Sequence, residues 1–146
     1  MLNGNIKCKK TKTYSVMDLR IGQTASLTKS FSERDVTLFS ELSLDRNEIH
    51  LDENYAKSSI FGRRIVHGFL SGSLISAVIG TLLPGKGAIY LHQDMDFKKP
   101  VFIGEMITAT VVVEKLKEEK RICYLQTQCA NQEGEIKISG SAVVKY

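Results

Sequence analysis

The feature that most constrains this chain is an uncharged stretch of sixteen residues, 68–83, which reads GFLSGSLISAVIGTLL. Its apolar side chains recur at steps of three and four residues, as at Leu70, Leu74 and Val78, and this spacing predicts a helix rather than a strand. The other side chains are apolar or small, so the helix has no polar face and we expect it to be buried. At about 1.5 Å per residue it spans roughly 24 Å, short of the roughly 30 Å hydrocarbon core of a bilayer. We therefore expect a central helix wrapped by a sheet, and no membrane span.

Small residues form a column along this helix at four-residue intervals: Gly68, Gly72, Ser76 and Gly80. Residues without bulky side chains allow a second backbone to approach a helix closely. The column therefore predicts tight packing against another element.

The rest of the chain alternates between strand-like and helix-like segments. Residues 22–31 are rich in β-type side chains, and Ser32 is a good N-cap for a helix over 33–43. Residues 44–65 show no periodicity, and so long a connection inside a compact domain is usually functional. The order of elements predicts an α+β architecture, in which an antiparallel sheet curls around one helix. Turn signals after that helix separate four strand candidates, residues 88–97, 106–116, 121–131 and 135–145.

Positive charge is concentrated at the N-terminus. The net charge of the 146 residues is +4, and residues 1–30 hold six Lys and Arg against one acidic residue, Asp18, which is +5. Subtracting +5 from +4 leaves about −1 for the rest of the chain. We therefore predict a flexible basic arm over residues 1–17 and one domain over 18–146, with no nucleic-acid partner.

The three cysteines, Cys8, Cys123 and Cys129, show neither a C-x-x-C pair nor a Cys/His zinc spacing. This count predicts neither a disulfide framework nor a structural metal, and it favours a reducing compartment. No apolar run follows the N-terminal lysines, which argues against a secretory signal. We expect a cytoplasmic protein, and the mitochondrial matrix is the alternative.

A carboxylate, an amide and an imidazole lie within six residues of the long connection, at Asp45, Asn47 and His50. Asp and Asn readily close turns through their own backbone, and His50 would then be incidental. Alternatively, the Asp and His side chains both reach one water, where one accepts a proton and the other delivers one, while the Asn orients the water. The residues alone permit both interpretations.

Gly68 opens the buried helix, where free backbone N–H groups point outward. Because it has no side chain, a ligand carbonyl could approach its N–H and be polarised there, as in an oxyanion hole. Gly68 could equally be the first residue of the packing column. Ser76, further along the helix, is either a packing residue or a ligand contact.

Three segments of the sequence resemble a known family. Residues 45–50, DRNEIH, and the segments LDENYAKSSIFGRRIVHGFLSGSLIS and LPGKGAIYLHQDMDFKKPVFIGE are similar to the MaoC-like (R)-specific enoyl-CoA hydratases. These enzymes form the hydratase 2 group of the hot-dog fold. Their motif, D-x-N-P-x-H followed eighteen residues later by the Gly of I-V-H-G, falls on Asp45, Asn47, His50 and Gly68. The similarity runs from about Asp18 to the C-terminus.

The resemblance implies a hot-dog subunit that forms a homodimer or a higher homo-oligomer. It implies a hydro-lyase that reversibly adds water to a trans-2-enoyl-CoA and gives the (3R)-3-hydroxyacyl-CoA. Asp45, Asn47, His50 and Gly68 would be catalytic, and no metal or redox cofactor would be needed because the thioester activates the alkene. Further substrate-binding candidates, by position, are His67, Ser76, Arg63 and Arg64.

Two residues depart from the family motif: Leu44 replaces the usual Gly before the Asp, and Glu48 replaces the usual Pro. Both change the geometry of the loop, and Glu48 adds a negative charge near the Asp and His. A dehydratase acting on acyl-carrier-protein thioesters would use the same residues in reverse. A non-catalytic acyl-thioester-binding subunit is the alternative outside the enzymes, although Asp45 and His50 are both present. Chain length, pathway and the choice of acid and base within the pair are not fixed by the sequence.

Overall fold

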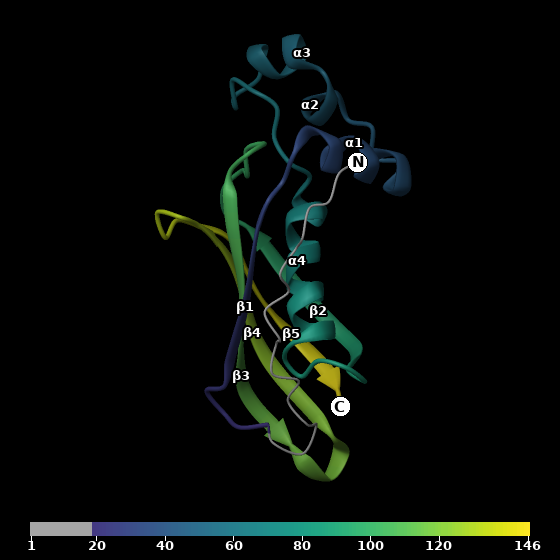
Figure 1. The fold of residues 1–146 in the computed structure, drawn as a ribbon, viewed down its shortest axis with the longest axis vertical. Coiled ribbons are helices and arrows are strands. Elements are labelled where there is room, and N and C mark those ends of the chain that lie inside the picture. Colours follow the sequence, from purple (N-terminus) through teal and green to yellow (C-terminus); the bar gives the residue numbers. More distant parts are fainter. Residues whose placement is uncertain (1–18) are drawn as a thin grey trace, which may run out of the picture.

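Helix α4 (Gly68–Thr81) lies against one face of a five-stranded sheet, and three further helices stand beyond one end of that sheet (Figure 1). The computed structural model describes residues 19–146, so the expected basic arm, 1–17, falls outside the described residues. The other elements are β1 (Thr24–Ser30), α1 (Glu33–Ser43), α2 (Glu48–Leu51), α3 (Glu53–Ser58), β2 (Ile89–Phe97), β3 (Met106–Lys117), a 3₁₀ turn (Glu118–Lys120), β4 (Ile122–Asn131) and β5 (Ile136–Lys145).

The sheet has the strand order β1-β3-β4-β5-β2, and every neighbouring pair is antiparallel. Alternate residues of β3, such as Ile107, Ala109 and Val111, are fully buried, while Thr108 and Thr110 between them are only partly buried. This period of two is what a sheet with one covered face requires. The expected curved antiparallel sheet around a helix, the hot-dog arrangement, is confirmed.

The sheet covers only one side of α4. Ile75, Val78 and Ile79 are 1 % exposed or less, whereas Phe69 is 69 % exposed and Ser76 is also exposed. The expectation that the helix is buried on every side is therefore wrong for this chain alone, because one sheet can cover only one face of a helix. Within the described residues, no helix is long and apolar enough to cross a membrane.

The small-residue column of α4 receives side chains of β2 rather than a second backbone. A Cβ placed on Gly68 would lie 2.6 Å from Cε1 of Phe97, and one placed on Gly72 would lie 2.6 Å from Sδ of Met95. At Gly80 the same test finds no atom within 4 Å. Close approach was therefore predicted correctly for two of the glycines, but the approaching groups are alternate side chains of one strand.

The connection between α1 and α4 contains two short helices, α2 and α3, where the sequence predicted only a loop. They have four and six residues, too few for an apolar period to be recognised. Helix α1 begins as predicted, with Ser32 and Asp35 forming a reciprocal capping box. Arg64 forms ion pairs with Glu33 of α1 and Glu53 of α3, so it holds the short helices against α1.

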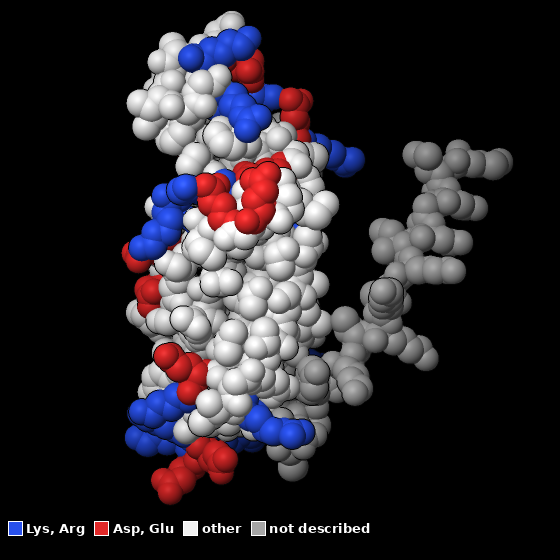
Figure 2. Space-filling view, turned by 90° about the vertical axis from the view of Figure 1, so that its left-hand side faces the viewer, with Lys and Arg blue, Asp and Glu red and all other residues white. Residues whose placement is uncertain are grey.

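On β1 and β3, the face of the sheet turned away from α4 carries paired hydroxyl groups. Ser26 pairs with Thr110 at 2.9 Å, and Thr28 pairs with Thr108 at 2.8 Å. Figure 2 shows this face, with a broad surface in its middle that is free of Lys, Arg, Asp and Glu. The face shown there offers no basic stripe to a phosphate backbone.

Candidate active site

Residues 65–67 lead into α4 and are called the α4 entry segment below. Main-chain hydrogen bonds hold this segment from two sides. The N–H of Ile65 donates to the carbonyl of Ile49 in α2 at 3.4 Å. The N–H of Val66 donates to the carbonyl of Val101, between β2 and β3, at 2.8 Å. The segment therefore brings the loop that contains α2 against the N-terminus of α4.

Asp45, His50 and His67 meet at this junction. Each offers one nitrogen or oxygen atom, and these three atoms lie within 4.8 Å of one another. Asp45 is exposed, whereas His50 is 8 % and His67 only 1 % exposed. The site is therefore a buried pair of imidazoles with a carboxylate at its solvent side.

The loop before α2 contains the turns that Asp and Asn are known to form. Oδ1 of Asp45 accepts the N–H of Asn47 at 3.2 Å, and Oδ1 of Asn47 accepts the N–H of Ile49 at 3.2 Å, which caps α2. The turn interpretation is therefore correct in its geometry. It does not compete with the chemical interpretation, because these turns also place the exposed carboxylate of Asp45 beside His50.

The two departures from the family motif have specific structural positions. Leu44 ends α1 with φ of 65°, a left-handed conformation that costs a residue with a side chain about 1 kcal/mol and that Gly adopts freely. Glu48 is the first residue of α2, a position that favours both Pro and acidic residues. Glu48 is exposed, so its charge lies in solvent.

One of the two ring nitrogens of His50 is hydrogen-bonded to the main chain. Its Nδ1 lies 2.8 Å from the carbonyl oxygen of Ile65. A carbonyl can only accept, so Nδ1 carries a proton, and Nε2 is the nitrogen that can exchange a proton with a water. The main chain of the α4 entry segment therefore sets the tautomer of His50.

His67 is more deeply buried than Asp45 and His50 and contacts both of them. Its Nε2 is 3.1 Å from the main-chain oxygen of Asp45 and 3.1 Å from Oγ of Ser40. Its ring stacks on that of His50, with centroids 3.8 Å apart and an interplanar angle of 28°. Burial lowers the pKa of His67 below its ordinary 6.5, against the opposing effect of the hydrogen bond to Asp45.

This lowered pKa has a measurable consequence for folding. Below about pH 6.5 the unfolded chain binds a proton at His67, whereas the folded chain keeps this ring neutral. The contribution of the neutral His67 to the free energy of unfolding is therefore present above about pH 6.5 and is lost as the pH falls. We expect the free energy of unfolding, measured by urea titration at pH 7.5 and 5.5, to fall more in the wild type than in His67→Gln. Equal losses in the two proteins would contradict a lowered pKa of His67.

The three side chains could in principle hold a metal ion, because two imidazoles and a carboxylate are common ligands. Coordination requires that the in-plane lone pairs of both rings converge on one point. Because the rings stack at 28° with centroids 3.8 Å apart, their lone pairs lie in two nearly parallel planes, and Nε2 of His67 is already occupied by Ser40 and Asp45. Joint coordination would therefore require both rings to turn, and the arrangement suits proton transfer better.

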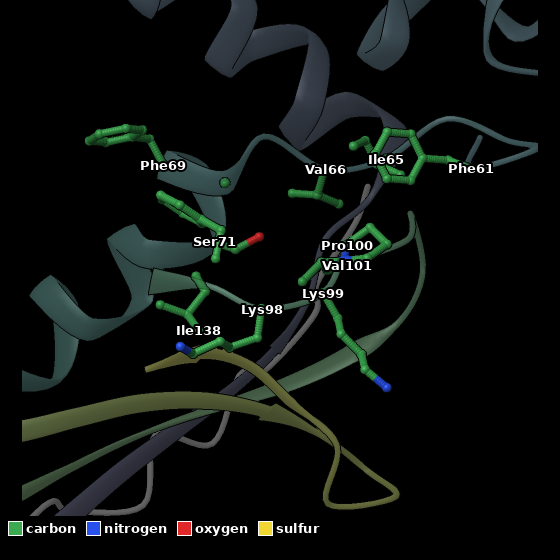
Figure 3. A pocket seen from close by; sticks show the side chains of 12 residues that line it. Phe61, Ile65, Val66, Phe69, Ser71, Lys98, Lys99, Pro100, Val101 and Ile138 are labelled. Carbon is green, nitrogen blue, oxygen red and sulfur yellow. The ribbon is translucent and has the colours of Figure 1, made fainter. Parts of the chain in front are cut away.

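A pocket of about 440 Å³ lies beside the α4 entry segment, and Ile65, Val66 and Gly68 are among its lining residues (Figure 3). Figure 3 shows Phe61 and Phe69 at opposite ends of the pocket and Lys98 and Lys99 along its lower side. Gly68 lines the pocket and directly follows His67, so the pocket and the Asp45–His50 pair adjoin the same segment. Most of the other lining residues are apolar, which suits an acyl chain rather than a charged group.

The structure gathers some of the predicted site residues and not others. Ser76 lies on the exposed face of α4, two turns beyond Gly68, and is not among the residues that line the pocket. The guanidinium of Arg63 lies 3.8 Å from the centre of the Phe102 ring, and that of Arg64 is paired with two carboxylates. His67 was expected to bind substrate, but a ring that is 1 % exposed offers a substrate almost no surface.

Sequence reasoning missed two groups that organise the site, Ser40 and the carbonyl of Ile65. Ser40 follows Val36 by one helical turn, and these two residues are the buried ones of α1. A polar residue within an apolar stripe was therefore a usable signal for a buried hydrogen bond. The Ile65 carbonyl is a main-chain group and left no signal.

Comparison with known proteins agrees with the geometry. The family model described as "MaoC like domain" matches residues 12–133. An (R)-specific enoyl-CoA hydratase of Rhodospirillum rubrum is 49% identical over 127 residues, which cover 87% of this chain and 88% of that protein. An (R)-specific enoyl-CoA hydratase of Aeromonas caviae is 47% identical over 131 residues, 90% of this chain and 98% of that one. The solved structure of an (R)-hydratase from A. caviae involved in PHA biosynthesis superposes with a TM-score of 0.85, over 87% of this chain and 96% of that chain.

Proposed function

This chain belongs to the MaoC-like family, and on that premise we propose that it is an (R)-specific enoyl-CoA hydratase. It adds water to a trans-2-enoyl-CoA and gives the (3R)-3-hydroxyacyl-CoA. The observation that carries the proposal is the meeting of Asp45 and His50 beside the N-terminus of α4, with Nε2 of His50 left to exchange a proton. The two curated relatives named (R)-specific enoyl-CoA hydratase support the same reaction.

Before the reaction, the Asp45–His50 pair must hold one transferable proton, besides the proton on Nδ1 of His50. A water held by Asp45, Asn47 and His50 attacks C3, and one member of the pair accepts the proton that this water loses. The other member delivers its proton to C2, so that the pair again holds one proton at the end. Both groups act from one side of the alkene, which gives syn addition. Either assignment of acid and base within the pair satisfies this balance.

Gly68 supplies the electrostatic part of the mechanism. Its N–H is at the first turn of α4, where main-chain donors have no partner within the helix. The thioester carbonyl accepts this N–H, which draws electron density from C3 and stabilises the enolate-like charge that follows. A donor of this kind is typically worth about 3 to 4 kcal/mol. The thioester activates the alkene, and the reaction uses neither a metal nor a redox cofactor.

The pocket beside Gly68 would take the substrate. Its aromatic and aliphatic walls suit an acyl chain or the pantetheine arm. Lys98 and Lys99 stand along its side, where ammonium groups could approach the phosphates of coenzyme A (Figure 3). These ammonium groups pair with Asp96 and Glu135, and exposed pairs of this kind contribute little to stability.

We also propose that the chain forms a homodimer in the cytoplasm or the mitochondrial matrix. β2 is an edge strand of the sheet, and its Ile89, Tyr90 and Leu91 are between 39 and 58 % exposed. The apolar first residues of this edge strand are a surface that a second copy could bury. Cys123 and Cys129 are buried free thiols, which suits a reducing compartment. Light scattering of the purified chain measures the oligomeric state.

The proposal is tested with purified protein and crotonyl-CoA. We expect a rapid loss of the enoyl-thioester ultraviolet absorbance and a product that is the (3R) alcohol. A carrier-protein dehydratase would instead act on crotonyl-acyl-carrier protein and leave crotonyl-CoA and longer enoyl-CoAs unchanged. A binding subunit would retain acyl-CoA without turnover. Either of these results, or the (3S) alcohol, would overturn the proposal.

Substitution of Gly68 tests the role of its N–H. The Cβ of Gly68→Ala would lie 2.6 Å from Phe97 Cε1, so either the Phe97 ring or the start of α4 must shift. We expect kcat for crotonyl-CoA to fall about 10-fold, because Ala keeps the N–H but moves it relative to the carbonyl. Adding Phe97→Ala to this variant removes the clash, and we expect part of the activity to return, with Phe97→Ala alone as the control. Wild-type kcat in Gly68→Ala would show that the position of this N–H does not matter.

A further inference from the structure

His67 is a buried polar group that the mechanism above does not use. It is 1 % exposed, and its Nδ1 has no hydrogen-bond partner among residues 19–146. It is the N-cap residue of α4, yet its side chain makes no capping hydrogen bond. Leaving one polar atom buried and unpaired costs about 1 to 3 kcal/mol. An imidazole at this position is therefore not explained by helix capping.

His67 contacts both members of the Asp45–His50 pair, in addition to Phe39 and Ser40 of α1. The main-chain oxygen of Asp45 can only accept, so Nε2 of His67 carries the ring's proton and donates it, shared with Oγ of Ser40. The face of the same ring stacks on His50 at 3.8 Å. One side chain thus holds the backbone of the first residue of the pair and the ring plane of the second.

The protonation of His67 suits this position. With its proton on Nε2 the ring is neutral, and a proton on Nδ1 would place a buried, unpartnered cation against His50. The titratable groups whose charges act on His67 are His50 and Asp45, and burial outweighs the favourable effect of Asp45. A neutral ring neither competes for the proton of the pair nor opposes the protonation of His50.

Resting on the proposed hydratase function, we propose that His67 is a positioning residue. Its Nε2–H holds the main chain of Asp45, and its ring holds the imidazole of His50, so that both reach one water. It stays neutral through the reaction and does not contact the substrate, which replaces the substrate-binding role expected from the sequence.

Two substitutions separate the two contacts. His67→Gln keeps an N–H donor at a similar reach but has no ring to stack on His50, and His67→Phe keeps a ring but has no donor. We expect each to lower kcat for crotonyl-CoA by about 10- to 100-fold while KM changes less than about 2-fold. Ser40→Ala removes only the second acceptor of Nε2, and we expect a smaller loss. Wild-type kcat in both His67 variants, or a rise in KM alone, would overturn the proposal.

A double variant distinguishes positioning from a general structural defect. If His67 acts through His50, then His67→Phe should cost less than about 2-fold further activity in a His50→Gln background. Losses that multiply would show that His67 acts independently of the pair and would contradict the proposal. Thermal unfolding of each variant accompanies the kinetics.

A measurement on the wild type does not depend on whether the variants fold. The chain has three histidines, so ¹⁵N-labelled imidazoles can be followed separately by NMR. We expect one histidine to remain neutral with its proton on Nε2 from pH 6 to 8, and its signal to be the one missing in His67→Gln or His67→Phe. A His67 that titrates near its ordinary pKa, or that carries its proton on Nδ1, would overturn the proposal. Absence of hydratase activity would instead overturn the proposed function while this signal could still be read.

Discussion

Asp45→Asn and His50→Gln are each expected to lower kcat for the hydration of crotonyl-CoA by about 10³-fold or more. Asn keeps the shape of Asp45 and one oxygen for the turn to Asn47, but it cannot accept a proton. Gln at position 50 can still donate to the Ile65 carbonyl, but it cannot shuttle a proton through Nε2. General acid and base groups typically contribute about 10² to 10⁴-fold each, and loss of one member leaves the other without its partner.

The measurement is the loss of enoyl-thioester absorbance at saturating crotonyl-CoA, with circular dichroism to show that each variant is folded. His92→Gln is the matched control for histidine replacement, because His92 is an exposed residue of β2 away from the pair. We expect it to keep wild-type activity. A folded His50→Gln or Asp45→Asn variant with more than about a tenth of the wild-type kcat would exclude the residue from proton transfer.

Gly140→Ala is expected to have the largest effect on stability. Gly140 lies in β5, opposite Met95 of β2, and a Cβ placed on it would lie 2.1 Å from the main-chain oxygen of Asp94. That oxygen belongs to a strand and cannot swing aside, so β2 and β5 would have to separate there. The hydrogen bonds of Ser141 to the Asp94 carboxylate, which lower the pKa of Asp94, would be disturbed as well. We expect a loss of about 3 kcal/mol or more in the free energy of unfolding, and a fall in Tm of roughly 10 °C.

Gly80→Ala is the control for this prediction, measured in the same thermal and urea titrations. A Cβ on Gly80 meets no atom within 4 Å, and Ala favours a helix over Gly by about 1 kcal/mol. We therefore expect Gly80→Ala to be neutral or stabilising. If Gly140→Ala were as stable as Gly80→Ala, the close passage of β2 over Gly140 would be wrong.

The elements of this fold were predictable because their signals are local. The period of α4, the capping residue Ser32 and the turns between strands act over a few residues, and the structure has these elements within one or two residues of their expected ends. The short helices α2 and α3 were missed because four and six residues do not complete a recognisable period.

The residue types at the site were also readable from the sequence, because Asp45, Asn47 and His50 lie close together along the chain. Their arrangement was not readable. The tautomer of His50 depends on a carbonyl 15 residues away, and the hydrogen bond of Ser40 to His67 joins residues 27 apart. Contacts of that kind follow from how α1, α2 and α4 pack, and no local pattern identifies the partner residue.

The sequence by itself determined a helix with no charged face, a sheet to cover it, and a carboxylate and an imidazole on the connection before it, because spacing and chemistry are properties of the chain. Only the tertiary structure decided that the sheet covers one face of α4, that Phe97 and Met95 fill the column of glycines, and that His67 is buried under His50. The physical reason is that the burial of a side chain and its hydrogen-bond partners depend on two segments that are distant along the chain. Their free energy is realised only when the packing of the whole domain brings those segments together.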